Sequence, residues 1–329
     1  MPSAATHKHL FYAELAKLVE AGFGIREAGK ILADTRLPGV QQRLLDLMQS
    51  GLESGKSIAD SIGSDPSLVS DLERGIISAG ERGGRLAPAF QHLADYFNLL
   101  ASARSEALKS MIYPTVLLHL GVIFGSAPGA VMRGESVSSI LGSIAITLGI
   151  IYALGIAVGI VSRLLLRAAP TNAVIDGLLN RIPLLGKARR DLALARFTKV
   201  YHTCLLAGLS MQETAATATT AAHSGRIAEA GRQLAATVKT GDKLGPVFIT
   251  SAAFPKAFAR SYATAEESGM LDKDLARWAD LFQQDALRSA KRVSTTIPKL
   301  FYGLVVIFVV WKILGFYQGY FDTLQKLEE

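Results

Sequence analysis

Apolar side chains are distributed along this chain in two different ways. Between residues 86 and 100 they recur at every third or fourth position, which predicts one apolar stripe along a helix. In three other ranges the chain is apolar almost throughout: residues 110–132, 137–161 and 300–321. Because a bilayer core of about 30 Å needs roughly 20 apolar residues in a helix, we interpret these three ranges as transmembrane helices.

The first two ranges contain no Asp, Glu, Lys or Arg, and only Arg133 to Ser136 separates them. The two helices should therefore form a tight antiparallel hairpin. The third range is interrupted by Lys312, whose long side chain can extend towards the membrane surface. An aromatic cluster at its end, from Phe316 to Phe321, is typical of a membrane–water interface.

Basic residues flank these predicted helices on one side only. Residues 162–190 carry six Lys or Arg against one acid, and further basic residues occur at 288–299, whereas the tail at 322–329 is acidic on balance. By the positive-inside rule the basic side is cytoplasmic, which places residues 322–329 in the periplasm. This distribution accounts for the net charge of +7, and no aromatic residues are interleaved with it in the manner of a nucleic-acid surface.

The parts outside the membrane are copies of each other. Pairs 186 residues apart match without a gap, from Phe11 with Phe197 to Glu81 with Glu267. One residue then drops out, so that Gly84 and Leu86 match Gly269 and Leu271. Pro114 and Pro298, each placed where the chain enters a membrane helix, also correspond. The repeat unit is therefore a helical domain that continues into a membrane helix.

No range shows sustained strand alternation, so we expect an all-α polytopic membrane protein. The predicted domains are a first cytoplasmic helical domain at 1–109, a transmembrane hairpin at 110–161, a second cytoplasmic domain at 162–299, a third transmembrane helix at 300–321 and a periplasmic tail at 322–329. Turn residues such as Gly22, Gly24 and Gly63 divide each repeat into a bundle of about six short helices. The N-terminal residues are polar and contain no apolar targeting segment, in keeping with a cytoplasmic first domain.

Few residues in the sequence suggest catalysis or ligand binding. Residues Gly51 to Ser57 resemble a phosphate-binding loop, but the spacing between the glycines is one residue short and the second repeat has no equivalent. Ser57 is instead expected to cap a helix. Cys204 is the single cysteine and is interpreted as a core residue, and the six histidines do not pair at metal-ligand spacing. We expect no catalytic site, cofactor or metal.

The most distinctive motif reads Gly80-Glu81-Arg82-Gly83-Gly84-Arg85-Leu86, and its partner in the second repeat reads Glu266-Glu267-Ser268-Gly269-Met270-Leu271. Either the acid stabilises a helix N-terminus or it contacts a partner protein. These turns, the apolar-striped helix, Ile112-Tyr113-Pro114, the repeat and the three membrane helices together resemble the type II secretion F family. The resemblance covers roughly residues 9 to 321. The short connection from Arg133 to Ser136 departs from the family's longer loop.

This resemblance implies an inner-membrane platform of type II secretion or type IV pilus systems, with no catalysis of its own. Its implied partners are a cytoplasmic hexameric ATPase, pilin or pseudopilin subunits, other inner-membrane assembly components and further copies of itself, at least as a homodimer. A small transporter or channel subunit is the alternative, for which only His119 and Lys312 offer polar groups within the membrane. An enzyme would need a nucleophile or metal cluster, and the sequence shows neither.

Overall fold

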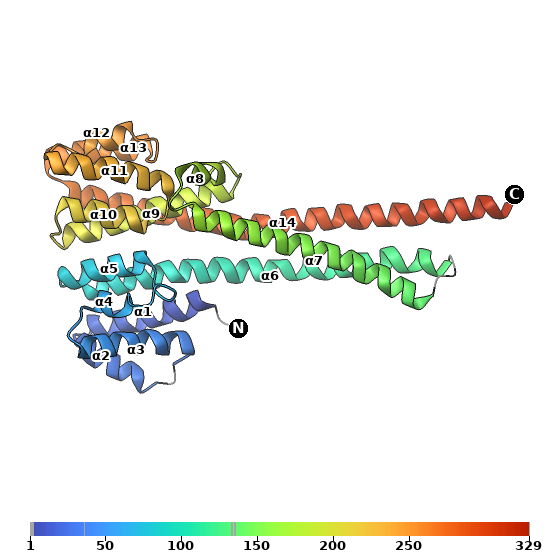
Figure 1. Ribbon diagram of the computed structural model, residues 1–329, viewed down its shortest axis with the longest axis horizontal. Coiled ribbons are helices and arrows are strands. Elements are labelled where there is room, and N and C mark those ends of the chain that lie inside the picture. The colour runs from blue at the N-terminus through green and yellow to red at the C-terminus, as the bar shows by residue number, and fades with distance from the viewer. Residues whose placement is uncertain (1–2, 36, 133, 135, 329) are drawn as a thin grey trace. The chain divides into compact units, whose positions relative to one another are not determined.

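The structure is a computed structural model that describes residues 3–35, 37–132, 134 and 136–328 (Figure 1). Every regular element in this part of the chain is an α-helix, as predicted. In chain order the helices are α1 (Ala4–Glu20), α2 (Ile25–Ala33), α3 (Gly39–Glu53), α4 (Ile58–Ile62), α5 (Asp71–Arg82), α6 (Leu86–Met132), α7 (Val137–Ala168), α8 (Ala173–Leu179), α9 (Leu185–Leu206), α10 (Met211–Ala221), α11 (Gly225–Thr240), α12 (Gly245–Thr250), α13 (Lys256–Ser268) and α14 (Leu271–Glu328).

Helices α1 to α6 correspond to α9 to α14, which confirms the internal repeat. The clearest structural marks of the duplication are three pairs of glycines with positive φ, each just after a helix. These pairs are Gly22 with Gly208, Gly55 with Gly241, and Gly84 with Gly269. In the first pair, the amide of Phe23 donates to the carbonyl of Leu18, and that of Leu209 donates to Cys204. Only glycine adopts this left-handed conformation without strain, so each glycine ends its helix at the same point in both repeats.

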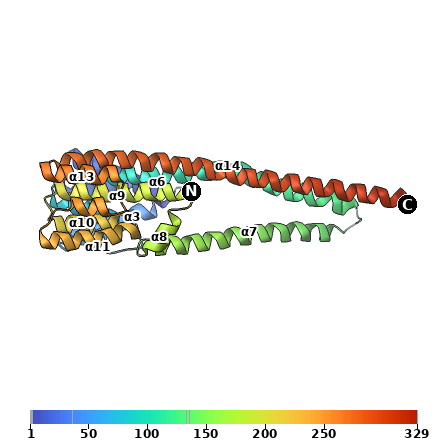
Figure 2. The same ribbon diagram turned by 90° about the horizontal axis from the view of Figure 1, so that it is seen from above.

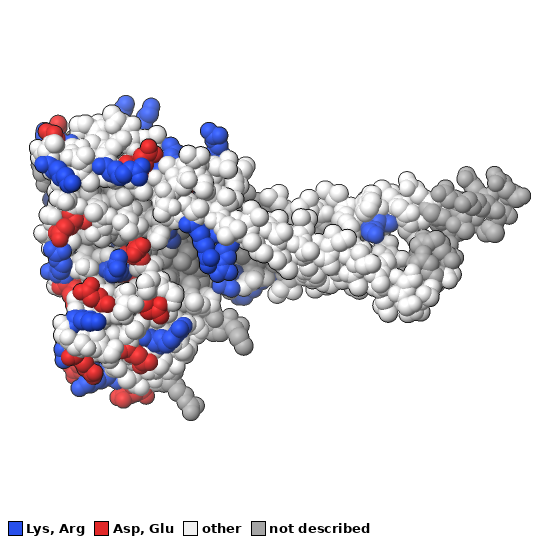
Figure 3. Space-filling model, in the orientation of Figure 1, with Lys and Arg blue, Asp and Glu red and all other residues white. Residues whose placement is uncertain are grey.

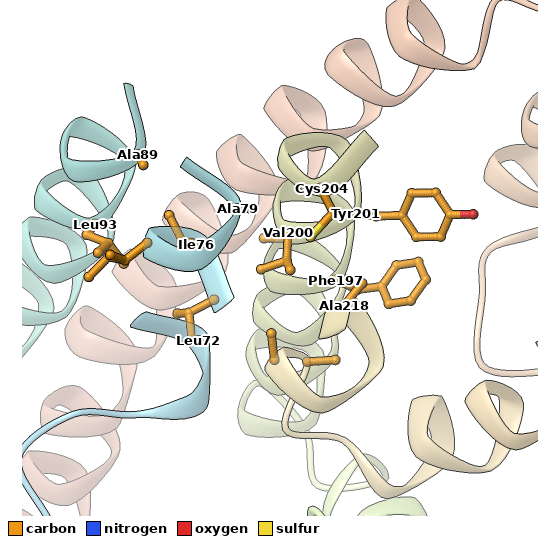
Figure 4. Packing of buried hydrophobic residues seen from close by; sticks show 14 of the residues in the cluster. Leu72, Ile76, Ala79, Ala89, Leu93, Phe197, Val200, Tyr201, Cys204 and Ala218 are labelled. Carbon is orange, nitrogen blue, oxygen red and sulfur yellow. The ribbon is translucent and has the colours of Figure 1, made fainter. Parts of the chain in front are cut away.

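Both repeats belong to one compact unit, formed by residues 1–102 and 168–291. A single cluster of buried apolar side chains extends through both repeats. In Figure 4, Leu72 and Ile76 of α5 lie between Leu93 of α6 and Val200 of α9. Phe197 and Tyr201 point from the other face of α9 towards the aromatic core of the second repeat (Figure 4). Helix α9 is therefore shared between two parts of the same core, and the repeats are not separate bodies.

Three helices are long and apolar enough to cross a membrane, as predicted: α6, α7 and α14. Two of these helices, α6 and α14, also contribute to the core of the compact unit that holds both repeats. The buried residues are Phe90 and Leu93 of α6, and Leu275 and Phe282 of α14. Helix α6 therefore continues without a break through the predicted boundary between residues 109 and 110. On the face shown in Figure 3, charged side chains gather on the short helices and are nearly absent from the apolar stretches of the long ones.

Helices α6 and α14 lie side by side in the second compact unit, formed by residues 103–167 and 292–329 (Figure 2). A Cβ atom added at Gly121 would lie 2.4 Å from Val309, and one at Gly125 would lie 2.8 Å from Cβ of Lys312. The Gly-x-x-x-Gly spacing thus permits close contact between these helices. Gly155 and Gly159 on α7, in contrast, face no atom within 4 Å.

The first two membrane helices also contact each other. Nδ1 of His119 lies 2.7 Å from the carbonyl oxygen of Thr115, and its Nε2 lies 2.7 Å from the hydroxyl of Tyr152 on α7. A carbonyl only accepts, so Nδ1 carries a proton and donates to Thr115. This pairing across α6 and α7 supports the predicted hairpin and uses both nitrogens of the imidazole. Arg133 and Glu135 in the connection, and the side chains of 322–329, lie outside the described residues.

Candidate functional site

Glu81 in the distinctive motif caps a helix far away in the sequence. Its carboxylate accepts hydrogen bonds from the backbone nitrogen of Ile58, at 2.9 and 3.0 Å, and from that of Ala59, at 3.3 Å. These two residues form the first turn of α4, whose free N–H groups need acceptors and whose dipole favours a negative charge. The carboxylate of Glu81 therefore fixes α4 against α5.

The second repeat makes the same connection with Glu266, which corrects the sequence pairing of Glu81 with Glu267. Glu266 accepts hydrogen bonds from the backbone nitrogens of Leu244 and Gly245, both at 2.8 Å, at the start of α12. Glu267 instead forms an exposed ion pair with Lys243 at 3.4 Å. The residue missing from the second repeat falls before α13 and not after it, because the caps Ser70 and Pro255 already show the shifted spacing. Because Glu266 and Glu267 are adjacent, the sequence alone did not show which of them corresponds to Glu81.

The glycines and leucines of the motif have local roles. Gly84 and Gly269 have φ of +63° and +71°, and the residue after each donates to a carbonyl five positions earlier. Each glycine thus closes one helix and turns the chain into a long one. Leu86 and Leu271 are the first residues of α6 and α14, and both pack on the common core. The motif joins the short helices of each repeat to its membrane helix.

The segment from Gly51 to Ser57 is a helix–helix connection. Ser57 is the N-cap of α4, as predicted, and its hydroxyl accepts from the backbone nitrogen of Asp60 at 3.0 Å. A Cβ atom at Gly51 would lie 2.0 Å from Oγ of Ser61, so glycine is needed for α3 to approach α4. The first amides of α4 are already bonded to Glu81, which leaves them unavailable to a phosphate group.

A seam between the repeats is formed by α5 and α6 of the first repeat with α9, α10 and α14 of the second. The repeats approach closely at Gly83, where an added Cβ would lie 2.8 Å from Cα of Ala207. At Gly75 an added Cβ would lie 3.0 Å from Cγ2 of Thr217. Small residues therefore let α5 pack tightly against α9 and α10, in a way that helical periodicity alone did not predict.

Polar groups from both repeats meet along this seam. The guanidinium of Arg196 donates to the hydroxyl of Tyr96 and lies 5.2 Å from the centre of its ring. Arg82 and Glu213 form an ion pair at 3.3 Å, in which both side chains are about half exposed. An exposed pair of this kind adds roughly 0–1 kcal/mol, so it contributes little to holding the repeats together.

Titratable side chains line a pocket of about 50 Å3 in the seam, among them His92, Asp95 and Lys199. Burial, followed by the charges of Lys199 and His202, lowers the pKa of His92 to about 3. Burial also lowers the pKa of Lys199, whose ammonium lies 3.7 Å from Asp280. His92 is therefore neutral near pH 7. The sequence offered no sign of this cluster, because its members come from three helices far apart in the chain.

Pro114 and Pro298 both lie inside continuous helices and are buried. They belong to the second compact unit, in which the rings of Tyr113 and Tyr302 lie 5.5 Å apart. The ring contact shows that α6 and α14 approach each other near these prolines. The role of both prolines at the membrane boundary remains a prediction.

No side chains in the described part of the chain are arranged for metal binding: no group of three His, Cys, Asp or Glu comes together there. Cys204 is buried, and burial raises the pKa of its thiol to about 12. The thiol is thus protonated and shielded at neutral pH, as expected of a core residue.

Comparison with known proteins agrees with the repeat and the membrane helices. The sequence profile of the family described as "Type II secretion system (T2SS), protein F" matches twice, at residues 11–132 and 197–319. The chain belongs to this family. The two matches begin at Phe11 and Phe197, the first pair of the internal repeat.

The relatives of this chain are named either for type II secretion or for type IV pilus assembly. A type II secretion system protein F of Pseudomonas aeruginosa is 27% identical, over 92% of this chain and 79% of that protein. One from Aeromonas hydrophila is 28% identical, over 81% of this chain and 73% of its own length. A type IV pilus assembly protein PilC of Pseudomonas aeruginosa is 22% identical, over 95% and 88%. Together with the three apolar helices, this family membership supports a multi-pass protein of the inner membrane.

Proposed function

We propose that this protein is a non-enzymatic inner-membrane platform of a type II secretion or type IV pilus-like machine. In this role it couples a cytoplasmic assembly ATPase to the insertion or removal of pilin or pseudopilin subunits. Family membership supports the class of machine, and the relatives named for secretion and for pilus assembly support both variants. Further copies of the chain and other inner-membrane assembly components complete the proposed set of partners.

The observation that carries the proposal is the continuity of α6 and α14. These helices have 47 and 58 residues, far more than the roughly 20 that cross a bilayer. Each contributes buried residues to the compact unit of the two repeats and then continues as a membrane helix, with no loop between. A displacement imposed on that unit is therefore transmitted to two membrane helices through continuous backbone, which is what coupling requires.

Both repeats are proposed to face the cytoplasm and the C-terminus the periplasm. Basic residues after α7 and before the apolar part of α14 support this orientation. The seam adds a further reason, since two repeats that share one core must lie on the same side of the membrane. An ATPase in the cytoplasm would then meet a single unit that carries both membrane connections.

Photocrosslinking in cells tests the proposal. A photoreactive amino acid is placed at Ser54 or Gln233, both exposed on the repeats, and at Ser136 between the first two membrane helices as the matched control. We expect the ATPase of the same gene neighbourhood to crosslink at one or both of the first two sites and never at Ser136. Crosslinking to the ATPase at Ser136 alone would refute the assigned orientation and the coupling with it.

A further inference from the structure

A basic pocket of about 290 Å3 lies in the second repeat, away from the seam. Its charged lining consists of Lys187, Arg190 and Arg226, with Asp191 as the single acid. Its volume is close to the lower bound of about 300 Å3 for small-molecule sites, and it holds a net positive charge. A pocket of this kind suits an anion, and guanidinium groups in particular match the geometry of phosphate oxygens.

The cations of this pocket are incompletely neutralised. Neither Arg190 nor Arg226 has an ion pair within the described residues, and the guanidinium of Arg226 donates only to the carbonyl of Ala252 at 3.1 Å. Lys187 lies 3.3 Å from Asp191. The nearby acid Asp176 already accepts from Arg189 at 2.9 Å, from the hydroxyl of Ser224 at 2.6 Å and from the backbone nitrogen of Arg226 at 3.2 Å. Two arginines therefore remain available to a ligand.

The pocket wall is bonded directly to the end of a membrane-spanning helix. Helix α7 ends at Ala168, and the carbonyl of Ala169 accepts from the backbone nitrogen of Gly225 at 3.1 Å. A Cβ atom at Gly225 would lie 2.6 to 2.7 Å from backbone atoms of residues 169, 172 and 173, so the contact is as tight as the backbone allows. Arg226 is the next residue. The pocket is thereby held where the chain leaves a membrane helix.

Only the repeat that follows a membrane helix has these residues. At the spacing of the internal repeat, Ala4 and Val40 stand in the positions of Arg190 and Arg226. Helix α8, which supplies Asn180 at its C-terminal end, also has no counterpart among α1 to α6. The duplicated fold does not require the pocket, so its charges serve something specific to the second repeat.

We propose that this pocket binds the phosphate of an anionic phospholipid headgroup, with Arg190 and Arg226 as its main ligands and Lys187 as a third cation. The lipid is favoured over a soluble phosphate ester because the wall of the pocket is fixed to the end of α7. Such a bond anchors the second repeat to the membrane surface. The proposal does not depend on coupling to an ATPase.

The test uses the full-length protein in neutral detergent, with native mass spectrometry to measure binding of short-chain phosphatidylglycerol. The Arg190→Ala/Arg226→Ala variant should bind it roughly thirtyfold more weakly, since each basic residue near a membrane contributes about a factor of five. Arg190→Lys/Arg226→Lys keeps both charges but loses the forked guanidinium geometry, so it should bind more weakly than the wild type and more tightly than the double alanine variant. Arg232→Ala is the matched control, an exposed arginine on the same helix as Arg226, and should change nothing.

Two further probes distinguish the source of the phosphate. Short-chain phosphatidylcholine, which lacks a net charge, and glycerol phosphate, which lacks the acyl chains, should both bind more weakly than phosphatidylglycerol. Equal binding of phosphatidylcholine, or an unchanged affinity in the double alanine variant, would overturn the proposal. Glycerol phosphate binding as tightly as the lipid would also overturn it, because the ligand would then be a soluble phosphate ester. If the double variant melts early, Arg190→Ala alone, at an exposed position, should still bind about fivefold more weakly.

Discussion

The ammonium group of Lys8 lies 2.8 Å from both carboxylate oxygens of Glu73, whose side chain is completely buried. The same carboxylate accepts from the hydroxyl of Tyr12 at 2.7 Å and from the backbone nitrogen of Ser70 at 2.8 Å. In the second repeat the corresponding residues are Leu194 and Phe258, both buried. A buried ion pair in one repeat is thus an apolar pair in the other.

The first prediction concerns this pair. Glu73→Leu alone should lower the free energy of unfolding by about 3–5 kcal/mol, because it leaves the charge of Lys8 buried without a partner. Adding Lys8→Met should recover at least about 1 kcal/mol, since the second repeat shows that an apolar pair fits this position. Denaturation of the full-length protein in detergent, followed by circular dichroism, measures both. If adding Lys8→Met lowered the free energy of unfolding of the Glu73→Leu variant further, the prediction would be contradicted.

The second prediction separates two neighbouring acids. Glu266→Ala removes the acceptor for the first amides of α12 and should cost about 1–2 kcal/mol of stability. Glu267→Ala removes only an exposed ion pair and should change stability by less than about 0.5 kcal/mol. Glu81→Ala should behave like Glu266→Ala. Thermal melting of the three variants decides the matter, and a larger loss for Glu267→Ala would restore the pairing that the sequence suggested.

The third prediction concerns the close approach of the repeats. Gly83→Leu places a side chain where Ala207 leaves no space, and overpacking of this kind costs about 1–3 kcal/mol. We expect a lower melting temperature together with reduced secretion or pilus assembly. Gly39→Leu, at the first position of α3, is the control, because nothing lies within 4 Å of a Cβ added there. Equal melting temperatures for the two variants would show that α5 and α9 are not packed this closely.

The fourth prediction is a pH dependence set by His92. Its pKa is lowered to about 3 in the folded protein by burial and by Lys199 and His202, whereas an unfolded chain ionises near 6.5. The unfolded state therefore binds more protons between about pH 6.5 and pH 3. Stability is fully present above this window and falls as the pH drops through it, by about 1 kcal/mol per pH unit. His92→Asn should lose stability less steeply between pH 7 and pH 5, and parallel curves would count against this assignment.

The fifth prediction fixes the topology. Cys204 is buried, so Cys204→Ala gives a background free of thiols in which single cysteines replace Ser54, Ser136, Gln233 or Thr323. With the outer membrane permeabilised, an impermeant maleimide should label positions 136 and 323. Positions 54 and 233 should react only after the inner membrane is broken. Labelling of position 233 from outside would rule out the platform role, and protection of position 323 alone would mean that the helix containing Lys312 does not cross.

Local features of the sequence determined much of this protein. Membrane insertion depends on the summed hydrophobicity of one continuous range, so the three membrane helices could be predicted without any tertiary contact. The same holds for the helix ends at Gly22 and Gly84, because glycine, which has no Cβ atom, adopts a positive φ without strain. The repeat, and with it the family, followed from the order of such local signals.

Only the tertiary structure decided which side chains meet. Glu266, and not Glu267, caps α12 because it accepts hydrogen bonds of 2.8 Å from amides more than twenty positions away. Helical periodicity carries no information about such a distant contact. The packing of Gly83 on Ala207, and the position of His92 beside Lys199, likewise require two helices from different repeats to be placed together. Sequence patterns record which face of a helix is apolar, but the partner of that face is set by close packing in three dimensions.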